Sequence, residues 1–584
     1  MRSGTLDRSA RAALTPLAPS VLLLLGSTIG FLGTLDPQVA QERLIGLIVA
    51  ALLSVLAVYA LQRTQPLLTV AVLALLGGVW VIAATGPDVF RGPVGSVLSF
   101  VFRPLFGVVR VTDSVEVANT RFIVGYNGLA DLCLVAIFSA GAMLLRGPRR
   151  AAPLALVLIA LVLLVGTGAR GGLTGLAAGI CAIGLYAWPR RYALLVLVAA
   201  PVAAVALMIG ALDKGLEFSS TAGRVAYWSD LARLLAEYPL TGVGLGVDTA
   251  NRVTLLYEIN PDPERIAYAH NTFVQAYLEQ GPLGFLGMLL IPLLALAGAL
   301  LARRHGIVDR QRTLLIAGLG IVGGLSAHGL TDQVVTTNVG TGLLLLGLAA
   351  TIVSLPSPAL GQLTRWLLRG GGAVALLAAL ALLLIAVLPG GRALALLDLG
   401  SVQANRALLM DTQSPERAAA LASAEDTLSA ALAQSPGHPA VRRNLARVRS
   451  AQYDDAGALA ALREASASPS LDAFDMLQIA HAYRDAGFPV EAYGWASRAY
   501  EATGRNFEDA VMQLYTQDTL TDDEGGHRAR TLATQAEAEM HARRFGTAEA
   551  LFTEALTFKP DNAYLQDRQG AAHRAVLKYG PGQQ

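Results

Sequence analysis

Long apolar runs constrain this 584-residue chain more than any other feature of its sequence. A helix needs about 20 mostly apolar residues to cross the hydrocarbon core of a bilayer. Composition agrees, because 54% of the residues are hydrophobic and only 15% are charged. Eleven runs of this kind cover residues 14–35, 44–61, 67–84, 127–145, 153–169, 172–188, 192–210, 271–300, 313–331, 339–355 and 371–388. The sequence therefore predicts an all-α polytopic membrane protein.

The chain changes character after the last run. From about Pro389 to Gln584 it is polar, rich in alanine and charge, and has no run long enough to span. We predict a membrane domain over residues 1–388 and a soluble helical-repeat domain over residues 389–584.

Small residues in this tail recur at the spacing of tetratricopeptide repeats, which are pairs of antiparallel helices of about 34 residues. The matching positions are Ile479, Ala480, Tyr483, Ala492, Ala496 and Ala499, then Ala536, Ala548, Phe552, Ala555 and Pro560, with Pro436 and Pro469 closing two weaker units. An unrelated array of helical hairpins is the alternative. Either arrangement is a solenoid that presents a surface to a protein partner.

Arginines predict the orientation of the chain. One set of short loops is rich in arginine, whereas the opposite short loops offer little beyond Arg43 and Arg170. The positive-inside rule places the rich set in the cytoplasm, which puts the N-terminus inside and the C-terminal domain outside the cytoplasmic (inner) membrane. Because ten more runs follow the first, we expect an uncleaved first helix rather than a signal peptide.

Several classes of function are disfavoured. A net charge of +2 is too small to indicate a nucleic-acid partner. Cys133 and Cys181 lie inside apolar runs, so we expect packing roles rather than a disulfide. No Cys/His spacing typical of a metal site is present in the sequence, and we expect neither a metal nor another cofactor.

Two of the predicted extracytoplasmic loops are long, covering about residues 85–126 and 211–270. The first includes a stretch from Phe90 to Arg110 that is too polar to span comfortably, because arginine at the bilayer centre costs about 2.5–3.5 kcal/mol. We expect an amphipathic segment in the membrane interface there.

The second long loop carries a predicted helix. Leucines and a tyrosine recur at helical spacing up to Tyr238, and Pro239 with the following glycines ends the helix. Arg224 and Trp228 are four residues apart and so share a face. The glycines at 242, 244 and 246 follow no strand, so we interpret them as a sharp backbone turn rather than a nucleotide site.

The loop re-enters the bilayer at Tyr268-Ala-His-Asn-Thr-Phe-Val-Gln-Ala-Tyr-Leu-Glu-Gln-Gly-Pro-Leu-Gly284. This places an imidazole, His270, at the predicted membrane surface with arginines in the same loop. Such a combination suits chemistry on an anionic, lipid-linked substrate.

An ordered series of motifs resembles the O-antigen ligase and polymerase superfamily over about residues 120–350. The series comprises Tyr126-Asn-Gly-Leu-Ala130, Thr167-Gly-Ala-Arg-Gly-Gly172, Gly223-Arg-Val-Ala-Tyr-Trp228, Tyr238-Pro-Leu-Thr-Gly-Val-Gly-Leu-Gly246, Ala269-His-Asn-Thr-Phe273 and Gly281-Pro-Leu-Gly284. The resemblance implies a GT-C-type membrane glycosyltransferase fold, usually with twelve spans, so we expect about 11–12. The tail is an extension that the simplest members lack.

The resemblance also implies a reaction. The donor would be a glycan on polyprenyl (undecaprenyl) diphosphate, used in cell-envelope polysaccharide or glycoconjugate assembly by a metal-independent, inverting glycosyltransferase. Guanidinium groups suit phosphate oxygens, so Arg170 and Arg224 are the expected diphosphate clamp and His270 the expected general base. Supporting candidates are Asn271, Trp228, Asn127, His328 and Asp332.

Each main candidate has a structural alternative. Arg170 would anchor a short loop at the lipid headgroups, and Arg224 would pair with Asp230 or Glu237 on its own helix. His270 would cap backbone groups at the start of a helix. His328 and Asp332, at the end of a span, would likewise be structural.

Three acceptors stay open: a lipid core for a ligase, another lipid-linked glycan for a polymerase, or a Ser or Thr hydroxyl for a protein O-oligosaccharyltransferase. A different class, a transporter or flippase of lipid-linked sugars, would place ionisable residues near mid-membrane and show paired repeats. A scaffold that organises glycan assembly would not need the His/Arg set. We favour the enzyme.

Overall fold

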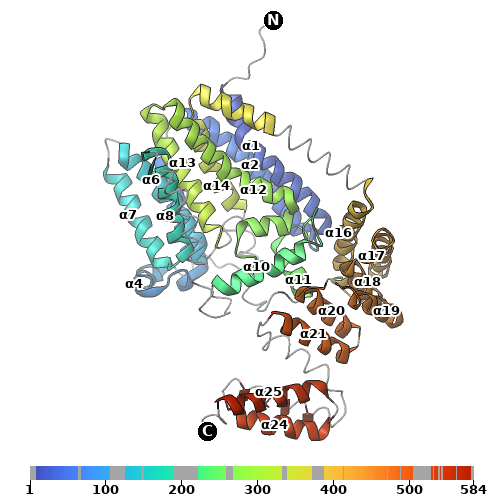
Figure 1. The fold of residues 1–584 in the computed structure, drawn as a ribbon. Helices are drawn as coiled ribbons and strands as arrows, with labels where there is room; N and C mark the ends of the chain where they lie inside the picture. Colours follow the sequence, from blue (N-terminus) through green and yellow to red (C-terminus); the bar gives the residue numbers. More distant parts are fainter. Residues whose placement is uncertain are drawn as a thin grey trace. The chain divides into compact units, whose positions relative to one another are not determined.

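The computed structural model describes residues 8–63, 67–105, 125–146, 150–189, 191–192, 221–257, 259, 268–331, 338–370, 387–411, 414–469, 471–486, 488–503, 544–560 and 562–579, with isolated positions between 528 and 540. Within these ranges the secondary structure is helical and includes no strand. The chain divides into two compact units, Met1–Leu388 and Pro389–Gln584 (Figure 1). We refer to them as the membrane unit and the C-terminal unit.

Long helices dominate the membrane unit. They are α1 (Arg8–Gly30), α2 (Pro37–Arg63), α3 (Leu67–Thr85), α6 (Gly125–Arg146), α7 (Ala151–Thr167), α8 (Arg170–Ala187), α12 (Thr272–His305), α13 (Asp309–His328) and α14 (Asn338–Val353). Shorter helices are α4 (Gly92–Phe102), α10 (Thr221–Leu235) and α11 (Val247–Leu256). Each predicted run that falls within the described ranges is helical over most of its length, whereas residues 193–210 and nearly all of 371–388 lie outside the described residues.

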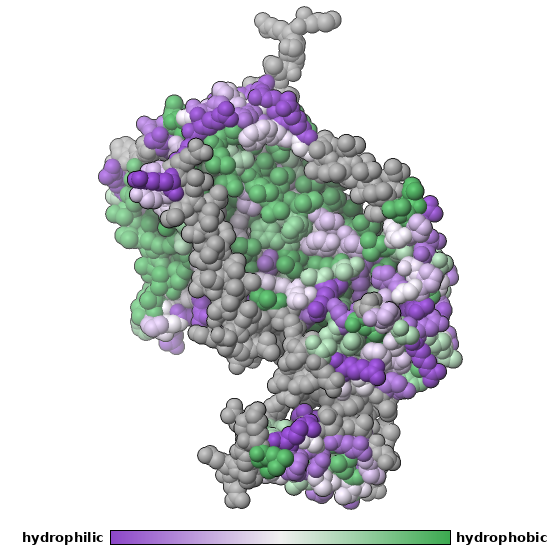
Figure 2. Space-filling model, viewed as in Figure 1, coloured by the Kyte–Doolittle hydropathy of each residue, from purple (hydrophilic) through white to green (hydrophobic). Residues whose placement is uncertain are grey.

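Five of the described helices are long and apolar enough to cross a membrane, and four more are apolar but shorter. The helices also turn large apolar side chains outward, where a soluble protein would place polar ones. Five leucines are each more than half exposed: Leu52, Leu56, Leu73, Leu76 and Leu158. Figure 2 shows hydrophobic residues covering the flank of this unit, bordered by hydrophilic ones. The predicted class, an all-α polytopic membrane protein, is confirmed.

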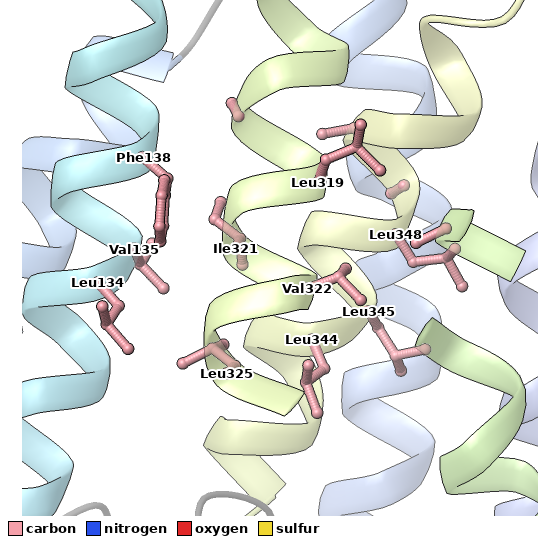
Figure 3. Close-up of a cluster of buried hydrophobic side chains, with 14 of the residues drawn as sticks. Leu134, Val135, Phe138, Leu319, Ile321, Val322, Leu325, Leu344, Leu345 and Leu348 are labelled. Carbon is pink, nitrogen blue, oxygen red and sulfur yellow. The ribbon is translucent and has the colours of Figure 1, made fainter. Parts of the chain in front are cut away.

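The core of the membrane unit lies where α6, α13 and α14 meet. Leu134, Val135 and Phe138 of α6 face Ile321 and its neighbours on α13, which in turn face leucines of α14 (Figure 3). Close approach of α6 and α13 requires glycine, because a Cβ on Gly320 would lie 2.3 Å from the Phe138 ring. Such small-residue contacts are typical of helix association in membranes. Both cysteines are free, and Cys133 is fully buried in this core.

Helix direction alternates, so one end of the bundle collects many helix ends. α1, α7 and α13 finish there, and α2, α6, α8, α12 and α14 begin there, as contacts between their terminal residues show. Figure 1 shows α10 lying across this end. We call it the polar end, because Asp131, Arg170, Arg224, His270 and His328 all lie there.

The helix α4 falls inside the stretch that we predicted to be amphipathic. Gly95 packs against the backbone of Gly166 in α7, while Val97, Phe100 and Val101 are exposed. An exposed apolar face next to arginines fits an interfacial helix, and its position in the interface stays a prediction.

The C-terminal unit is built from helix pairs. They are α16 (Pro389–Leu408) with α17 (Pro415–Gln434), α18 (Pro439–Ala451) with α19 (Asp455–Ser466), α20 (Ala473–Asp485) with α21 (Pro489–Thr503), and α24 (Phe545–Phe558) with α25 (Ala563–Tyr579). The alanines and aromatic residues that we predicted at helix crossings are buried, including Ala480, Ala492, Ala499 and Phe552. The helical character of this unit is confirmed, and its assignment to tetratricopeptide repeats stays a prediction.

Candidate active site

A tight turn between α7 and α8 positions Arg170. Gly168 ends α7 with a φ of 63°, a left-handed conformation that glycine adopts without strain. The Thr167 hydroxyl donates to the Leu164 carbonyl at 2.6 Å and accepts from the Ala169 amide at 3.1 Å, which closes the turn. Arg170 is therefore the first residue of α8, with its side chain exposed at the polar end.

The helix α10 carries Arg224 and Trp228 on one face, as predicted. Arg224 donates from Nη1 to the carbonyl of Thr331, just beyond α13. Trp228 donates from its indole nitrogen to the Ala269 carbonyl at 2.6 Å. Because the Arg224 contact is to a backbone oxygen rather than a carboxylate, it leaves the positive charge uncompensated.

The ion pairs that we considered for Arg224 are wrong. Asp230 instead lies 3.6 Å from Arg233 on the same helix. Glu237 accepts from the Tyr257 hydroxyl at 3.2 Å, in a buried cluster beyond the end of the helix. Burial raises the pKa of Tyr227 on α10 above its usual value, so this phenol stays protonated and is a poor candidate for a base.

The glycine-rich loop after α10 has the structural role that we predicted. Gly242, Gly244 and Gly246 all have positive φ values, of 69°, 133° and 110°. The loop enters a break in α12, where Gly281 has a φ of 62°, and the Val243 amide donates to the Leu278 carbonyl at 2.8 Å. A side chain at 242 or 281 would collide with backbone atoms at 2.5–2.6 Å, so the loop and the break fit one another only through glycine.

His270 lies immediately before α12 in an unusual conformation. Its φ is 47°, a region that residues other than glycine seldom occupy. Its ring lies 4.3 Å from the ring of Tyr268, measured between centroids. The capping role considered for His270 is wrong, because Asn271 is the N-cap and accepts from the amides of Phe273 and Val274 at 3.0 and 3.2 Å.

The residues after α13 join these parts together. The Thr272 amide donates to the Gly329 carbonyl at 2.7 Å, and Asn271 donates from Nδ2 to the Leu330 carbonyl at 3.2 Å. Arg224 reaches the carbonyl of Thr331 in the same segment. Segment 329–331 thus connects α10 with the start of α12.

The start of α8 reaches the same segment. A Cβ on Gly171, the residue after Arg170, would lie 2.7 Å from the Thr331 hydroxyl and 2.9 Å from His328 Nε2. His328 is fully buried, with Nδ1 2.6 Å from the Asp131 carboxylate of α6. This buried pair gives His328 a structural contact. Asn127, another candidate, lies one turn before Asp131 on α6. Asp332 lies outside the described residues.

Several polar residues at this end were not among our candidates. Asp131, Arg43 and Glu279 are each buried inside apolar helices, and Glu279 lies 3.3 Å from Arg43. Arg91, before α4, stacks over the Tyr126 ring with its guanidinium 3.7 Å from the ring centroid. The signal that marks the buried residues is an ionisable side chain within an apolar run, which is costly unless it is paired.

The molecule is thus a polytopic membrane protein in which arginine, histidine and tryptophan side chains gather at one end of the bundle. Residues 155–289 match the family model described as O-antigen ligase, and this match supports the predicted resemblance of the membrane unit to the O-antigen ligase superfamily. The match includes Arg170, Arg224, Trp228, His270 and Asn271, whereas Asn127, His328 and Asp332 lie outside it. No curated protein matches the chain at a significant level. At the level of the family, the function is O-antigen ligase-like glycan transfer by a glycosyltransferase-like enzyme.

Proposed function

We propose that this protein transfers a glycan from a polyprenyl-diphosphate donor to an acceptor hydroxyl, on the extracytoplasmic face of the cytoplasmic membrane. The observation that carries the proposal is the meeting of three elements at segment 329–331. Arg224 bonds to this segment, the residue after Arg170 packs against it, and the residues after His270 are bonded to it. Two cations and an imidazole therefore share the polar end, within or beside the stretch that matches the ligase family.

The arginines are the proposed clamp for the leaving diphosphate. Arg170 is exposed at the start of α8, where the helix dipole adds partial positive charge. Arg224 is held by one nitrogen through Thr331, which orients the rest of the guanidinium fork. Guanidinium groups stay charged at any relevant pH and match phosphate oxygens in pairs. Both arginines would stabilise the charge that develops on the diphosphate as its bond to the sugar breaks.

His270 is the proposed general base. It would take the proton from the acceptor hydroxyl as that oxygen attacks the anomeric carbon of the first sugar. The carbon–oxygen bond to the diphosphate then breaks, and polyprenyl diphosphate leaves with the bonding electrons. Attack from the face opposite the leaving group inverts the anomeric centre. The proton remains on the imidazole until solvent removes it, so the step needs no redox partner.

Neighbouring residues would support these groups. Trp228 donates to the carbonyl of Ala269, the residue before His270, and Asn271, the residue after His270, accepts from the Phe273 amide as the N-cap of α12. His328 and Asn127 stay supporting candidates through their places beside the α8 and α6 starts. For Asp332 the proposal rests on the sequence alone.

Since the clamp charge comes from arginine, we expect transfer to proceed with chelator present and without nucleoside triphosphate. Loss of transfer in EDTA, with recovery on addition of magnesium, would indicate instead that a cation neutralises the diphosphate.

The C-terminal unit is proposed to bind a protein partner or a macromolecular acceptor on the same side of the membrane as the polar end. Single cysteines at Tyr453, which is 88% exposed, and at the exposed Arg304 test the sidedness in a background lacking Cys133 and Cys181. A membrane-impermeant reagent should label position 453 in intact cells and position 304 only after lysis. Labelling of 304 alone in intact cells would reverse the proposed orientation.

The decisive experiment gives the purified protein a labelled lipid-linked glycan and, in separate reactions, a lipid core, a lipid-linked glycan and a Ser/Thr-containing protein. A covalent product with one acceptor establishes the reaction and names the acceptor. Movement of the labelled lipid across vesicles without any covalent product would indicate the transporter instead.

A further inference from the structure

A chain of buried polar side chains runs from α2 to the turn that holds His270. Gln275, in the first turn of α12, accepts from the Ala269 amide at 2.8 Å through Oε1. Its Nε2 donates to Glu279 Oε1, one turn further along the helix, at 2.9 Å. Glu279 Oε2 lies 3.3 Å from Arg43 Nε on α2. The chain therefore links a second helix to the residue immediately before His270.

Glu279 also holds the glycine-rich loop. The Gly246 amide donates to Glu279 Oε2 at 3.3 Å, so one carboxylate contacts α2, α12 and this loop. Gln275 and Glu279 are each 1% exposed, and Arg43 is 8% exposed. Because these side chains are so little exposed, losing one of the contacts leaves a buried polar group without its partner, which is costly.

The backbone conformation at His270 needs support from neighbouring hydrogen bonds. A φ of 47° costs a non-glycine residue on the order of 1–2 kcal/mol, so neighbouring contacts must maintain it. On the C-terminal side, Asn271 is fixed as the N-cap of α12. On the N-terminal side, the Ala269 amide is bound by Gln275 and its carbonyl by Trp228. Gln275 is thus one of the residues that restrain the turn on that side.

Stability alone is a weak reason for this arrangement. Replacing a buried ion pair by apolar residues of similar volume is often neutral or stabilising, because the pair has lost its hydration. An apolar α12 would also cross a bilayer more readily. A buried polar chain is better explained by orientation, since hydrogen bonds fix a geometry that apolar packing does not.

We propose that Arg43, Glu279 and Gln275 are positioning residues that hold the His270 turn in its working geometry. The catalytic part of this inference rests on the proposed function of His270. The structural part does not, because the hydrogen-bonded side chains hold the conformation of residues 269–271 whatever reaction occurs there. Gln275 acts directly on the turn, and Glu279 and Arg43 act through Gln275.

The test uses Gln275→Met, which keeps the length of the side chain and removes both hydrogen bonds. The matched control is Gln280→Met, because Gln280 is similarly buried, borders the same small cavity as Arg43 and Glu279, and is not part of the chain. Glu279→Gln retains an acceptor for Gln275, whereas Glu279→Met does not, so this pair separates loss of the contact from loss of the charge.

The fluorescence of Trp228 reports the conformation of the His270 turn without any assay of activity, because the indole donates to the Ala269 carbonyl. In full-length protein with Trp80, Trp188, Trp366 and Trp495 changed to Phe, we expect Gln275→Met and Glu279→Met to shift the Trp228 emission. Gln280→Met should leave it unchanged, and Glu279→Gln should shift it less than Glu279→Met. An emission maximum that does not respond to Gln275→Met overturns the proposal.

Kinetics then test the link to His270. Gln275→Met should slow single-turnover transfer about tenfold to a hundredfold, the scale of a misplaced catalytic group. Binding of undecaprenyl diphosphate should change less than twofold. Adding His270→Ala to Gln275→Met should slow transfer little beyond His270→Ala alone, because both changes remove the same function. Rate losses that multiply in the double variant would overturn the positioning role.

The two proposals fail separately. Without any glycan product from the unaltered protein, the proposed function fails, and the Trp228 emission still decides whether the chain holds the turn. With normal transfer in Gln275→Met, the positioning proposal fails and the proposed function stands. Should Gln275→Met not accumulate in membranes, the two Glu279 variants give the same decision.

Discussion

The two units of this protein are both helical, yet they pack in opposite ways. The membrane unit exposes leucines such as Leu56 and Leu76 and brings its helices together through glycines such as Gly320. The C-terminal unit buries its apolar side chains, and alanines such as Ala492 and Ala499 form its helix contacts. In lipid, an outward leucine costs nothing and helices associate by close contact, whereas in water the burial of apolar surface drives association.

Buried polar groups serve different ends in the two units. In the C-terminal unit Arg447 donates to Gln478 at 3.1 Å, and Arg443 lies 3.5 Å from Asp475, so both link α18 to α20 of the next helix pair. In the membrane unit the pairs lie at the polar end, beside the candidate catalytic residues. The stretch that matches the ligase family, residues 155–289, also lies in the membrane unit.

The largest expected effect is a loss of turnover, and it should follow from changing a histidine of the membrane unit but not one of the C-terminal unit. His270→Ala should lower turnover by about 10²–10⁴, the usual contribution of a general base, while donor binding persists. His573→Ala is the control, because His573 is an exposed histidine of α25 that contacts Glu549 of α24. Single-turnover rates and donor affinities are measured on the same preparations. Near-normal turnover of His270→Ala would make the histidine structural.

Core truncation should distinguish the stability of the units. Phe552 is fully buried between α24 and α25, so Phe552→Ala should destabilise that helix pair by about 3–5 kcal/mol. Limited proteolysis and thermal unfolding measure the loss. Tyr453→Ala, at an exposed position, should change neither. Donor binding by the membrane unit should be unaffected, and a matching loss of donor binding would show that the units depend on one another.

Arginines on one helix test the proposed clamp. Arg224→Ala should weaken binding of undecaprenyl diphosphate about tenfold to a hundredfold, as expected when charge-assisted hydrogen bonds worth about 1.5–3 kcal/mol are lost. Arg224→Lys should recover part of the affinity, because an ammonium carries the charge but not the fork. Arg233→Ala is the control, since Arg233 pairs with Asp230 on the same helix. Equal affinities for Arg224→Ala and Arg233→Ala would remove Arg224 from the clamp.

Helix caps should show a smaller difference. Asn271 caps α12, and Asp472 caps α20 through a capping box with Asp475. Replacing either cap with alanine should cost about 1 kcal/mol of stability. Only Asn271→Ala should also slow transfer, because its cap adjoins His270. Thermal unfolding and transfer rates measured together test this, and slowed transfer in Asp472→Ala would contradict the division of roles.

Truncation after Gly390 should have the smallest effect on the membrane unit. Residues 1–388 form a compact unit through contacts among themselves, so we expect normal insertion and normal transfer to a small acceptor. Transfer to a macromolecular acceptor, or the length of its product, should change because the proposed binding surface is gone. Membrane fractionation and product analysis provide the measurement. Failure of the truncated chain to insert would make the C-terminal unit necessary for folding.

The sequence by itself determined the helices of the membrane unit, because an apolar segment of sufficient length must satisfy its backbone within itself in lipid. It also predicted local features: the turn before Arg170, the shared face of Arg224 and Trp228, and the bend made by Gly242 and its neighbours. Each of these depends on residues close in the chain, whose spacing and φ preferences are legible directly.

Only the tertiary structure decided which distant residues meet. Arg224 is bonded across 107 residues to Thr331, and His328 across 197 residues to Asp131. Spacing shows which side chains share a face of one helix, but not which other helix that face will contact. The choice between Asp230 and Thr331 as partner of Arg224, and the link from Arg43 to the His270 turn, depend on helix packing for this physical reason.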